Sequence, residues 1–377
     1  MEPKIRFKGF EGEWKTSTIG EIAPLQRGYD LPTNNVISGT IPVVYSNGIL
    51  RFHNEGKCQA PAIITGRSGT IGKFTYIDHG EYWPHNTSLW VTTFHKNYPR
   101  FVYYFFQNVG FEKYATGSGV PTLNRNDIHK HIESIPSNKE EQQAIASYFT
   151  TLDSQISAST SCLASLKQMK AASLQAMFPQ EGETVPKIRF KGFKGEWKKV
   201  KADSIFKTFN EKNRPDLPVL SATQDRGMVT RESIGYNIFH DTSNEATYKH
   251  ILPGQFVIHL RSFQGGFAHS EIEGIASPAY TIIDFKNKDL YHDYYWRYVF
   301  MSKEFIKRLE LITYGIRDGR SISYDEFKEM SFLVPSKEEQ IKIASYLKNL
   351  DRQISLQSQR LEKLKQIKSA CLDKMFV

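Results

Sequence analysis

The chain has 377 residues, of which 40% are hydrophobic and 24% are charged, and it carries a formal net charge of +9. This composition is that of a globular protein of two or three domains, and the basic charge favours an acidic partner, nucleic acid first. No stretch has the length and apolar character of a membrane span or a signal peptide, which argues against both. Three dispersed cysteines without metal-ligand spacing fit a reducing, cytoplasmic location.

A short motif with aromatic and glycine residues opens the chain and returns in its second half. The sequence PKIRFKGFEGEW at 3–14 recurs as PKIRFKGFKGEW at 186–197, with 11 of 12 residues identical. Its aromatic side chains can anchor it and its glycines permit tight turns. We therefore expect an extended segment that docks onto its domain or onto the end of a helix.

The segment after the first motif is predicted to be rich in β-strands, because short runs of β-branched and aromatic residues are bounded by glycine, proline and asparagine. Residues 66–73 partly match a phosphate-binding loop, but Arg67 stands where that motif requires glycine, and Phe74 where it requires serine or threonine. A turn between two strands is the favoured interpretation there. The expected strands are 41–45, 62–65, 74–78 and 88–93, and the expected helices are 101–108 and a short one near 126–131.

Two long helices are predicted at 136–178 and 335–377, and they are copies of each other. From residue 139 and from residue 337 onward, 22 of 40 aligned positions are identical without a gap. Their apolar residues alternate at spacings of three and four, which is the pattern of a coiled-coil seam. The seam residues are Ile145, Phe149, Leu152, Ile156, Leu163 and Leu166 in the first copy and Ile343, Leu347, Leu350, Ile354, Leu361 and Leu364 in the second.

Polar residues interrupt both seams at corresponding positions. Ser159 corresponds to Gln357, and Lys170 corresponds to Lys368. Polar seam residues either fix the register of paired helices or contact a partner, and the sequence leaves both interpretations open.

The second half repeats the order of motif, globular segment and long helix. Its globular segment differs from the first far more than the motifs and helices differ, and the alignment we favour places Ile64 opposite Ile258. A repeated frame with two divergent modules is expected if the frame builds a fixed geometry while each module recognises something different. The strands expected in the second segment are 219–222, 256–260 and 280–285, and the helices are 291–301 and 303–311.

The predicted fold class is α+β, with an internal duplication. Two mixed α/β modules, 1–135 and 186–334, are separated by the helices 136–178 and 335–377, and a linker spans 179–185. A pseudo-twofold relation between the halves predicts that the helices pair as an antiparallel coiled coil, with the modules near opposite ends of the rods.

The loops of both modules carry the side chains that DNA recognition needs. Arginine can bond guanine, and asparagine or glutamine can bond adenine, whereas lysine and arginine neutralise phosphates. For any one residue, an ordinary solvated loop position remains the alternative. The candidates are Tyr45, Ser46, Asn47, Arg67, Ser68, Lys73, His85, Asn86 and Thr87 in the first module and Thr223, Gln224, Arg226, Arg261, Ser262, Gln264, Arg317 and Arg320 in the second.

Patterns of catalytic and cofactor sites are missing from the sequence. There is no Gly-x-Gly-x-x-Gly after a strand, no Asn-Pro-Pro-aromatic tetrapeptide of amino-methyltransferases, no Gly-x-Ser-x-Gly and no cluster of cysteine and histidine. We therefore expect no catalytic residue, no metal site and no enzyme activity in this chain.

The two KIRFKGF-x-GEW motifs, together with the two helices that begin KEEQ and continue through IASY, LD and QIS, make the chain resemble the specificity subunit of type I restriction-modification systems. The resemblance covers essentially the whole length. It implies two target recognition domains, each of which binds one half of an asymmetric, split site in double-stranded DNA, on a subunit that is not itself catalytic.

The resemblance also implies partners. Two methyltransferase subunits would use S-adenosylmethionine to methylate adenine, and restriction subunits would use ATP and Mg²⁺, while this chain binds no cofactor. Two alternatives stay open: a coiled-coil adaptor that binds only protein, and a self-contained DNA methyltransferase or nuclease. Salt-dependent DNA binding would argue against the adaptor, and binding of S-adenosylmethionine or cleavage of DNA by the isolated chain would support the enzyme.

Overall fold

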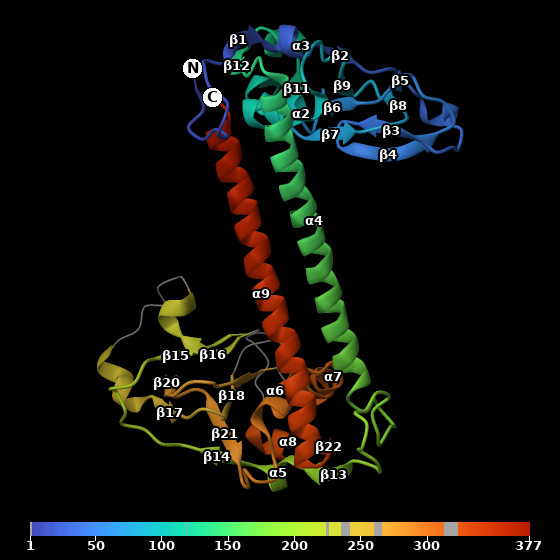
Figure 1. Ribbon diagram of the computed structural model, residues 1–377. Coiled ribbons are helices and arrows are strands. Elements are labelled where there is room, and N and C mark those ends of the chain that lie inside the picture. Colours follow the sequence, from blue (N-terminus) through green and yellow to red (C-terminus); the bar gives the residue numbers. More distant parts are fainter. Residues whose placement is uncertain (1, 118, 224–225, 235–241, 260–265, 313–322) are drawn as a thin grey trace. The chain divides into compact units, whose positions relative to one another are not determined.

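The computed structural model describes residues 2–117, 119–223, 226–234, 242–259, 266–312 and 323–377. The chain divides into two compact units, Met1–Ser161 with Ser358–Val377, and Cys162–Gln357. Each unit holds one globular module and about one half of each of two long helices, α4 (Lys139–Ala176) and α9 (Lys337–Met375) (Figure 1). We call residues 1–135 module 1 and residues 186–334 module 2. No helix in the described ranges has the length and hydropathy to cross a membrane.

The strands of module 1 are β1 (Lys15–Thr18), β2 (Leu25–Arg27), β3 (Ile41–Tyr45), β4 (Gly48–His53), β5 (Cys58–Gln59), β6 (Ala62–Gly66), β7 (Phe74–Ile77), β8 (Glu81–Pro84), β9 (Ser88–Val91), β10 (Ala115–Thr116), β11 (Thr122–Leu123) and β12 (Ile132–Ile135). One sheet has the order β2-β9-β6-β7 and is antiparallel throughout. A second sheet has the order β4-β3-β8-β5, in which β3 and β8 run parallel. The pairs β1–β12 and β10–β11 are separate ribbons.

The helices of module 1 are α1 (Ile19–Ile22), α2 (Pro99–Val109) and α3 (Arg125–His129), with 3₁₀ turns at Thr33–Asn35 and Phe111–Tyr114. Helix α2 begins with a proline, which suits the first helical turn, and ends at Gly110, whose φ of 74° is the left-handed conformation of a helix terminus. Its buried face carries four of the eight buried aromatic residues of the core cluster. The α2 prediction is therefore confirmed.

Strand β6 lies at the centre of module 1 and is buried along its whole length. Because successive side chains of a strand point to opposite faces, Ile63 and Ile64 contribute to different clusters. Ile63 packs with Phe101 and the rest of α2, whereas Ile64 packs with Val44 of β3. The strand is thus covered by a helix on one face and by the second sheet on the other, which explains its continuous apolar sequence.

In unit 1, the beginning of α4 pairs with the end of α9. Tyr148 OH lies 3.3 Å from Cys371 Sγ, and Lys368 Nζ lies 2.7 Å from Asp153 Oδ1. Advancing along α4 corresponds to moving backward along α9, so the two helices are antiparallel here. The ring of Phe376 packs on Phe149, with their centroids 5.9 Å apart.

The strands of module 2 are β13 (Lys198–Lys201), β14 (Phe206–Phe209), β15 (Leu220–Thr223), β16 (Gly227–Thr230), β17 (Lys249–Ile251), β18 (Phe256–Ile258), β19 (Phe267–His269), β20 (Gly274–Ala276), β21 (Thr281–Phe285) and β22 (Ser331–Val334). The sheet β14-β21-β18-β19 repeats the order of β2-β9-β6-β7. The pairs β15–β16, β17–β20 and β13–β22 correspond to β3–β4, β5–β8 and β1–β12. The duplication inferred from the flanking motifs thus extends to the topology of the modules.

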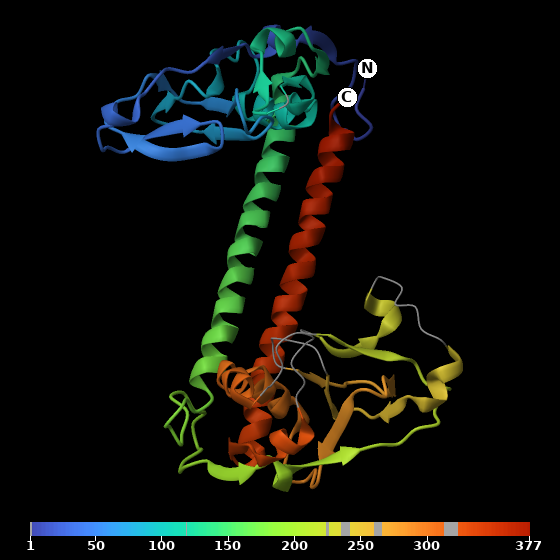
Figure 2. The same ribbon diagram turned by 180° about the vertical axis from the view of Figure 1, so that it is seen from behind.

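The helices of module 2 are α5 (Ala202–Ile205), α6 (Asp293–Met301), α7 (Lys303–Ile312) and α8 (Tyr324–Glu329), with 3₁₀ turns at Arg231–Ile234 and Thr242–Thr247. In unit 2, the end of α4 pairs with the beginning of α9. Ser173 Oγ lies 3.2 Å from Tyr346 OH, and Lys170 Nζ lies 2.5 Å from Asp351 Oδ1. The pairing is again antiparallel, and both views show the two helices side by side (Figure 2).

The repeated short motif docks at the ends of the long helices, as predicted. In unit 1, Ile5 N donates to Lys374 O of α9 at 2.9 Å, and Arg6 forms a two-pronged bond with the buried Glu141 of α4. In unit 2, Ile188 N donates to Ala176 O at 2.9 Å, and Arg189 binds Glu339 in the same way. Each motif therefore joins the last turn of one long helix to the first turn of the other.

The two long helices pair as predicted, but the first seam residues of each helix also pack into a module core. Ile145, Phe149 and Leu152 are buried in the core of module 1, and the corresponding Ile343, Leu347 and Leu350 are buried in the core of module 2. The first half of each helix thus packs mainly into its own module, and the opposing helix contributes its end to the same cluster. The other predicted seam residues are partly or fully buried, namely Ile156, Leu163, Leu166, Ile354, Leu361 and Leu364.

The alignment of the two globular segments needs a correction. Ile258 packs with Phe256 in the cluster that faces helix α6, whereas Ile64 faces the second sheet of module 1. The two isoleucines therefore lie on opposite faces of equivalent strands, β6 and β18. The proposed correspondence of Ile64 with Ile258 is wrong, because a correct alignment must shift one strand by an odd number of residues.

Candidate nucleic-acid interface

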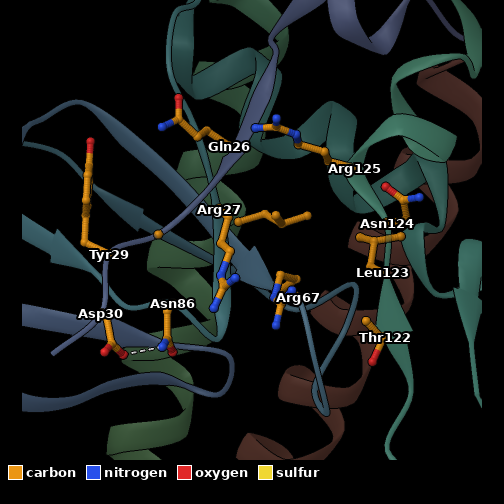
Figure 3. A pocket seen from close by; sticks show the side chains of 12 residues that line it. Gln26, Arg27, Tyr29, Asp30, Arg67, Asn86, Thr122, Leu123, Asn124 and Arg125 are labelled. Carbon is orange, nitrogen blue, oxygen red and sulfur yellow. Dashed lines mark hydrogen bonds between the residues drawn. The ribbon is translucent and has the colours of Figure 1, made fainter. Parts of the chain in front are cut away.

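Module 1 contains a cavity of about 700 Å³ that is open to solvent and lined by four separate segments. They are β2 with the loop after it, the residue that follows β6, the turn between β8 and β9, and the connection from β11 to α3. Figure 3 shows these side chains, with the guanidinium groups of Arg27 and Arg67 toward one another and that of Arg125 beside Gln26. The lining residues are Gln26, Arg27, Gly28, Tyr29, Asp30, Arg67, Asn86, Leu89, Thr122, Leu123, Asn124 and Arg125.

Backbone hydrogen bonds hold these loops together. Arg67 N donates to Thr87 O at 2.8 Å, and Leu123 N donates to Arg67 O at 2.7 Å. Gly28 packs so closely on the backbone of His85 that a Cβ would overlap His85 O. The backbone of Arg67 is thus held on both sides by main-chain hydrogen bonds. Only glycine fits at position 28, directly after Arg27 at the end of β2.

Positive charge dominates the cavity. Arg27 and Arg125 are exposed and Arg67 is half-buried, and none of the three guanidinium groups has an ion pair with any residue in the described ranges. Arg67 Nε is buried and has no hydrogen-bond partner among the described residues. The carboxylate that lines the cavity, Asp30, accepts a hydrogen bond from Asn86 Nδ2 (Figure 3).

A histidine is hydrogen-bonded to β2, the strand that carries Gln26 and Arg27 of the cavity. His129, at the end of α3, accepts a hydrogen bond at Nε2 from Leu25 N at 2.8 Å. Burial lowers the pKa of His129 below its ordinary value of 6.5, and the nearby cation of Arg125 lowers it further. The imidazole is therefore neutral at physiological pH, with Nε2 free of a proton, as this hydrogen bond requires.

Several predicted residues form a second group beside the cavity. The rings of Tyr45 and His85 are 4.1 Å apart, and His85 Nδ1 lies 3.0 Å from Thr87 Oγ1. Ser46 N donates to the same hydroxyl at 3.4 Å. Burial lowers the pKa of His85, so its ring is neutral and packs at a tilt of 32° against the ring of Tyr45. These side chains are held mainly by one another.

The structure thus brings most of the predicted residues of module 1 together. Arg67 and Asn86 line the cavity, and Ser68 adjoins it through a bridge to Thr122. Asn47 is exposed at the turn between β3 and β4. Lys73 is exposed at the start of β7 and does not line the cavity.

Among the lining residues that sequence reasoning missed are two amides and two guanidinium groups, those of Gln26, Arg27, Asn124 and Arg125. They come from a short strand and from a helix N-terminus that pack against the predicted loops only in three dimensions. A usable signal was nevertheless present, since Gln-Arg before Gly28 and Asn-Arg at the start of α3 each pair an amide with a guanidinium. Those are the two side-chain types selected for the other loops.

In module 2, the described candidates have structural roles. Thr223 Oγ1 donates to Gly227 O at 2.8 Å and accepts from Arg226 N at 3.2 Å, which closes the turn between β15 and β16. Arg226 Nη1 donates to Ser233 O at 3.5 Å. The remaining predicted positions, Gln224, Arg261, Ser262, Gln264, Arg317 and Arg320, lie outside the described residues.

Module 2 also contains a basic pair that was not predicted, with Arg231 directly after β16 and Lys249 in β17. Arg231 Nε donates to Ser221 Oγ at 3.3 Å, while its Nη1 is buried without a partner in the described ranges. Lys249 Nζ donates to Tyr280 O at 2.6 Å, and burial lowers the pKa of this lysine, with a further contribution from Lys212.

The structure also tests the partial match to a phosphate-binding loop and the possibility of a metal site. Residues 66–73 connect β6 to β7 as a turn, so they do not precede a helix as a phosphate-binding loop does. No group of three or more histidine, cysteine, aspartate and glutamate residues in the described part of the chain could hold a metal ion.

Comparison with known proteins gives a consistent result. A family model described as the type I restriction modification DNA specificity domain matches the chain twice, at residues 11–168 and 194–366. These two ranges cover most of the chain. A search of the curated proteins found no match.

Solved structures share the fold. The S subunit of a type I restriction-modification system from M. genitalium aligns with a TM-score of 0.69 at 15% identity, over 100% of this chain and 99% of that one. A chain from a study of complex assembly and conformational transition in a type I R-M system aligns with a TM-score of 0.51 at 15% identity, over 97% and 98% of the two chains. At these identities the likeness concerns the fold alone.

Proposed function

We propose that this chain, which belongs to the family of type I restriction modification DNA specificity domains, recognises a bipartite and asymmetric site in double-stranded DNA through its two modules. The observation that carries the proposal is the contrast inside the duplication. Both modules have the same strand order, yet the loops at equivalent places carry different residues. Two modules of one fold with different loops are suited to bind two different half-sequences.

Charge supports DNA as the ligand. The cavity of module 1 carries three arginines without ion pairs in the described ranges, and module 2 carries Arg231 directly after β16 and Lys249 in β17. Cations that lack an internal counter-charge are available to neutralise phosphates. The predicted loop residues Tyr45, Asn47 and Arg67 belong to the proposed interface of module 1.

The long helices are proposed to be a spacer and an assembly surface. The helix α4 connects the two modules in sequence, and its length would set the distance between half-sites. We propose that two methyltransferase subunits bind this chain and that restriction subunits join them, as the name of one structural relative refers to complex assembly in a type I system. S-adenosylmethionine, ATP and Mg²⁺ would then be bound by these partners, and this chain carries out no reaction itself.

One experiment tests the proposal directly. The chain is co-expressed with its cognate methyltransferase subunit, and adenine methylation is mapped across the genomic DNA of the host cell. We expect methylation at one split motif with two unlike halves and a fixed number of unread bases between them. A continuous motif, or no methylation together with no DNA binding by the purified complex, would reject the proposal and favour a protein-binding adaptor.

A further inference from the structure

We propose that the cavity of module 1 binds the sugar-phosphate backbone of DNA through the guanidinium groups of Arg27, Arg67 and Arg125. The inference rests on the proposed function and makes it more specific. It assigns to this cavity the affinity for DNA and not the recognition of a base sequence, so the bases must be recognised by other residues of the module.

The cavity lining carries more positive than negative side chains. Three guanidinium groups line one cavity of about 700 Å³, and none has an ion pair in the described ranges. The aspartate of the cavity, Asp30, is engaged by Asn86. Like charges that line one cavity repel each other unless an anion neutralises them. The ligand that fits is therefore a polyanion.

Arg67 has a fixed backbone and an unsatisfied side-chain nitrogen. Its Nε is buried without a hydrogen-bond partner among the described residues, which costs free energy in the absence of a ligand. Its backbone is bonded on both sides, at Thr87 and Leu123, so the side chain is held in place and does not need to be ordered by the ligand. In Figure 3, the guanidinium groups of Arg27 and Arg67 point into the same space.

The charges of the cavity fit phosphates better than the edge of a base. A guanine edge offers neutral acceptors to a single arginine, whereas consecutive phosphates bring a full charge each, as several unpaired guanidinium groups along one cavity require. Asn86, an amide of the cavity, donates one of its two Nδ2 hydrogens to Asp30, so its side chain is already oriented by the protein. Side chains that recognise bases must enter a groove, and Arg67 is recessed.

The inference is tested on the full chain co-purified with its methyltransferase subunit. Binding is measured by fluorescence anisotropy with two probes, a duplex of the mapped site and a duplex of scrambled sequence, between 50 and 200 mM salt. The variants are Arg27→Ala, Arg67→Ala and Arg125→Ala. We expect each to weaken binding to both duplexes by the same factor, roughly three- to tenfold, and to reduce the slope of log K against log salt by about 0.9.

Two further variants make the outcome decisive. Arg67→Lys keeps the charge but not the planar fork, so it should retain most of the affinity if the contact is with phosphate. It also keeps the inference testable if Arg67→Ala fails to fold. The matched control is Arg100→Ala in the same module, because Arg100 is already paired with Asp78 at 3.4 Å and lies over the ring of Tyr76. Its salt slope should equal that of the parent.

The results that overturn the inference differ from those that reject the proposed function. Loss of selectivity at one base position in Arg67→Ala, with an unchanged salt slope, would make Arg67 a base-recognising residue. Unchanged affinity in all three alanine variants would show that DNA does not occupy the cavity. Failure of the proposed function is seen in the parent complex instead, as absence of DNA binding and of methylation.

Discussion

Lys368 Nζ lies 2.7 Å from Asp153 Oδ1, and the other oxygen of this carboxylate accepts a hydrogen bond from Tyr104 OH at 2.9 Å. The three residues belong to α9, α4 and α2, so one carboxylate joins both long helices to the core of module 1. Tyr104 is almost completely buried, and burial raises the pKa of its hydroxyl. A lysine at a coiled-coil seam is explained by this triad.

Unit 2 contains the same triad, formed by Lys170, Asp351 and Tyr298. The lysine is 2.5 Å from the carboxylate, and the tyrosine hydroxyl donates to it at 2.7 Å. A slip of one helix past the other by a single turn, about 5.4 Å, would break the lysine contact in each unit. The two lysines that interrupt the seam therefore act within the chain to fix the register of the antiparallel pair.

Replacing Asp153 with alanine should destabilise unit 1 by about 1–3 kcal/mol, because it leaves a buried tyrosine hydroxyl with only the longer bond to Thr150 Oγ1, at 3.4 Å, and a lysine without its partner. The free energy of unfolding is measured in urea by circular dichroism. Glu329→Ala is the control, since the Lys201–Glu329 pair is exposed on both sides and should contribute less than about 1 kcal/mol. Equal effects of the two substitutions would contradict the role of the triad.

Removing Arg6 should have a larger effect. Its guanidinium binds both oxygens of Glu141, at 2.7 and 2.9 Å, and this glutamate side chain is only 2% exposed. Arg6→Ala leaves a buried carboxylate without its counter-ion, for which we expect a loss of about 3–5 kcal/mol. Arg189→Ala removes the equivalent partner of Glu339 and should behave alike.

The measurement for Arg6 is again denaturant unfolding, with Glu141→Gln combined with Arg6→Ala as the matched double variant. Neutralising the buried carboxylate should recover most of the stability lost in Arg6→Ala, because the uncompensated charge is then gone. A double variant no more stable than Arg6→Ala would show that lost packing, and not the charge, accounts for the effect.

The sequence predicted the frame of this protein well, because its signals are local. The alternating apolar residues of 139–178 specify a helix and its buried stripe, and β6 and β9 are short apolar runs between turn residues. The sequence could not show that Ile145 and Phe149 face the module core, since the end of α9 reaches the same cluster from more than 200 residues away. Strand β8 was missed because it ends in proline, which argues against a strand inside a sheet.

The site was predicted only in part. Arg67 and Asn86 stand in loops whose composition is distinctive, so the sequence identified them. Arg27 and Arg125 come from a strand and a helix terminus, and they reach the cavity only because β2 pairs with β9 and α3 folds against it. Residues that converge through non-local pairing leave no spacing pattern in one sequence. The misplaced correspondence of Ile64 and Ile258 has the same origin.

His129 should make the stability of unit 1 depend on pH. Burial lowers its pKa in the folded state below the unfolded value of 6.5, so between these two values the unfolded state binds more protons. The stabilisation is fully present above pH 6.5 and is lost as the pH falls through 6.5 toward the folded pKa. We expect the free energy of unfolding, measured from pH 8 to pH 5, to fall in this window.

His129→Gln separates this contribution from the other histidines, because the glutamine amide can accept the bond from Leu25 N without titrating. Burial also lowers the pKa of His85 and His292, so the parent and the variant both lose stability in acid. The parent should lose more. Identical pH profiles of the two proteins would show that His129 does not titrate differently in the folded and unfolded states.

Shortening both long helices by seven residues should change the gap of the DNA site and leave the half-sequences intact. Deleting 157–163 from α4 and 355–361 from α9 removes about 10.5 Å of helix, which corresponds to roughly three base pairs of duplex. A seven-residue deletion keeps the phase of the seam, whereas a deletion of five rotates the remaining helix face out of the pair and should unfold it. Methylation mapping reports the new gap. A motif with the original gap, produced by a folded and active complex, would mean that the helices do not set the spacing and that DNA bending or module movement does.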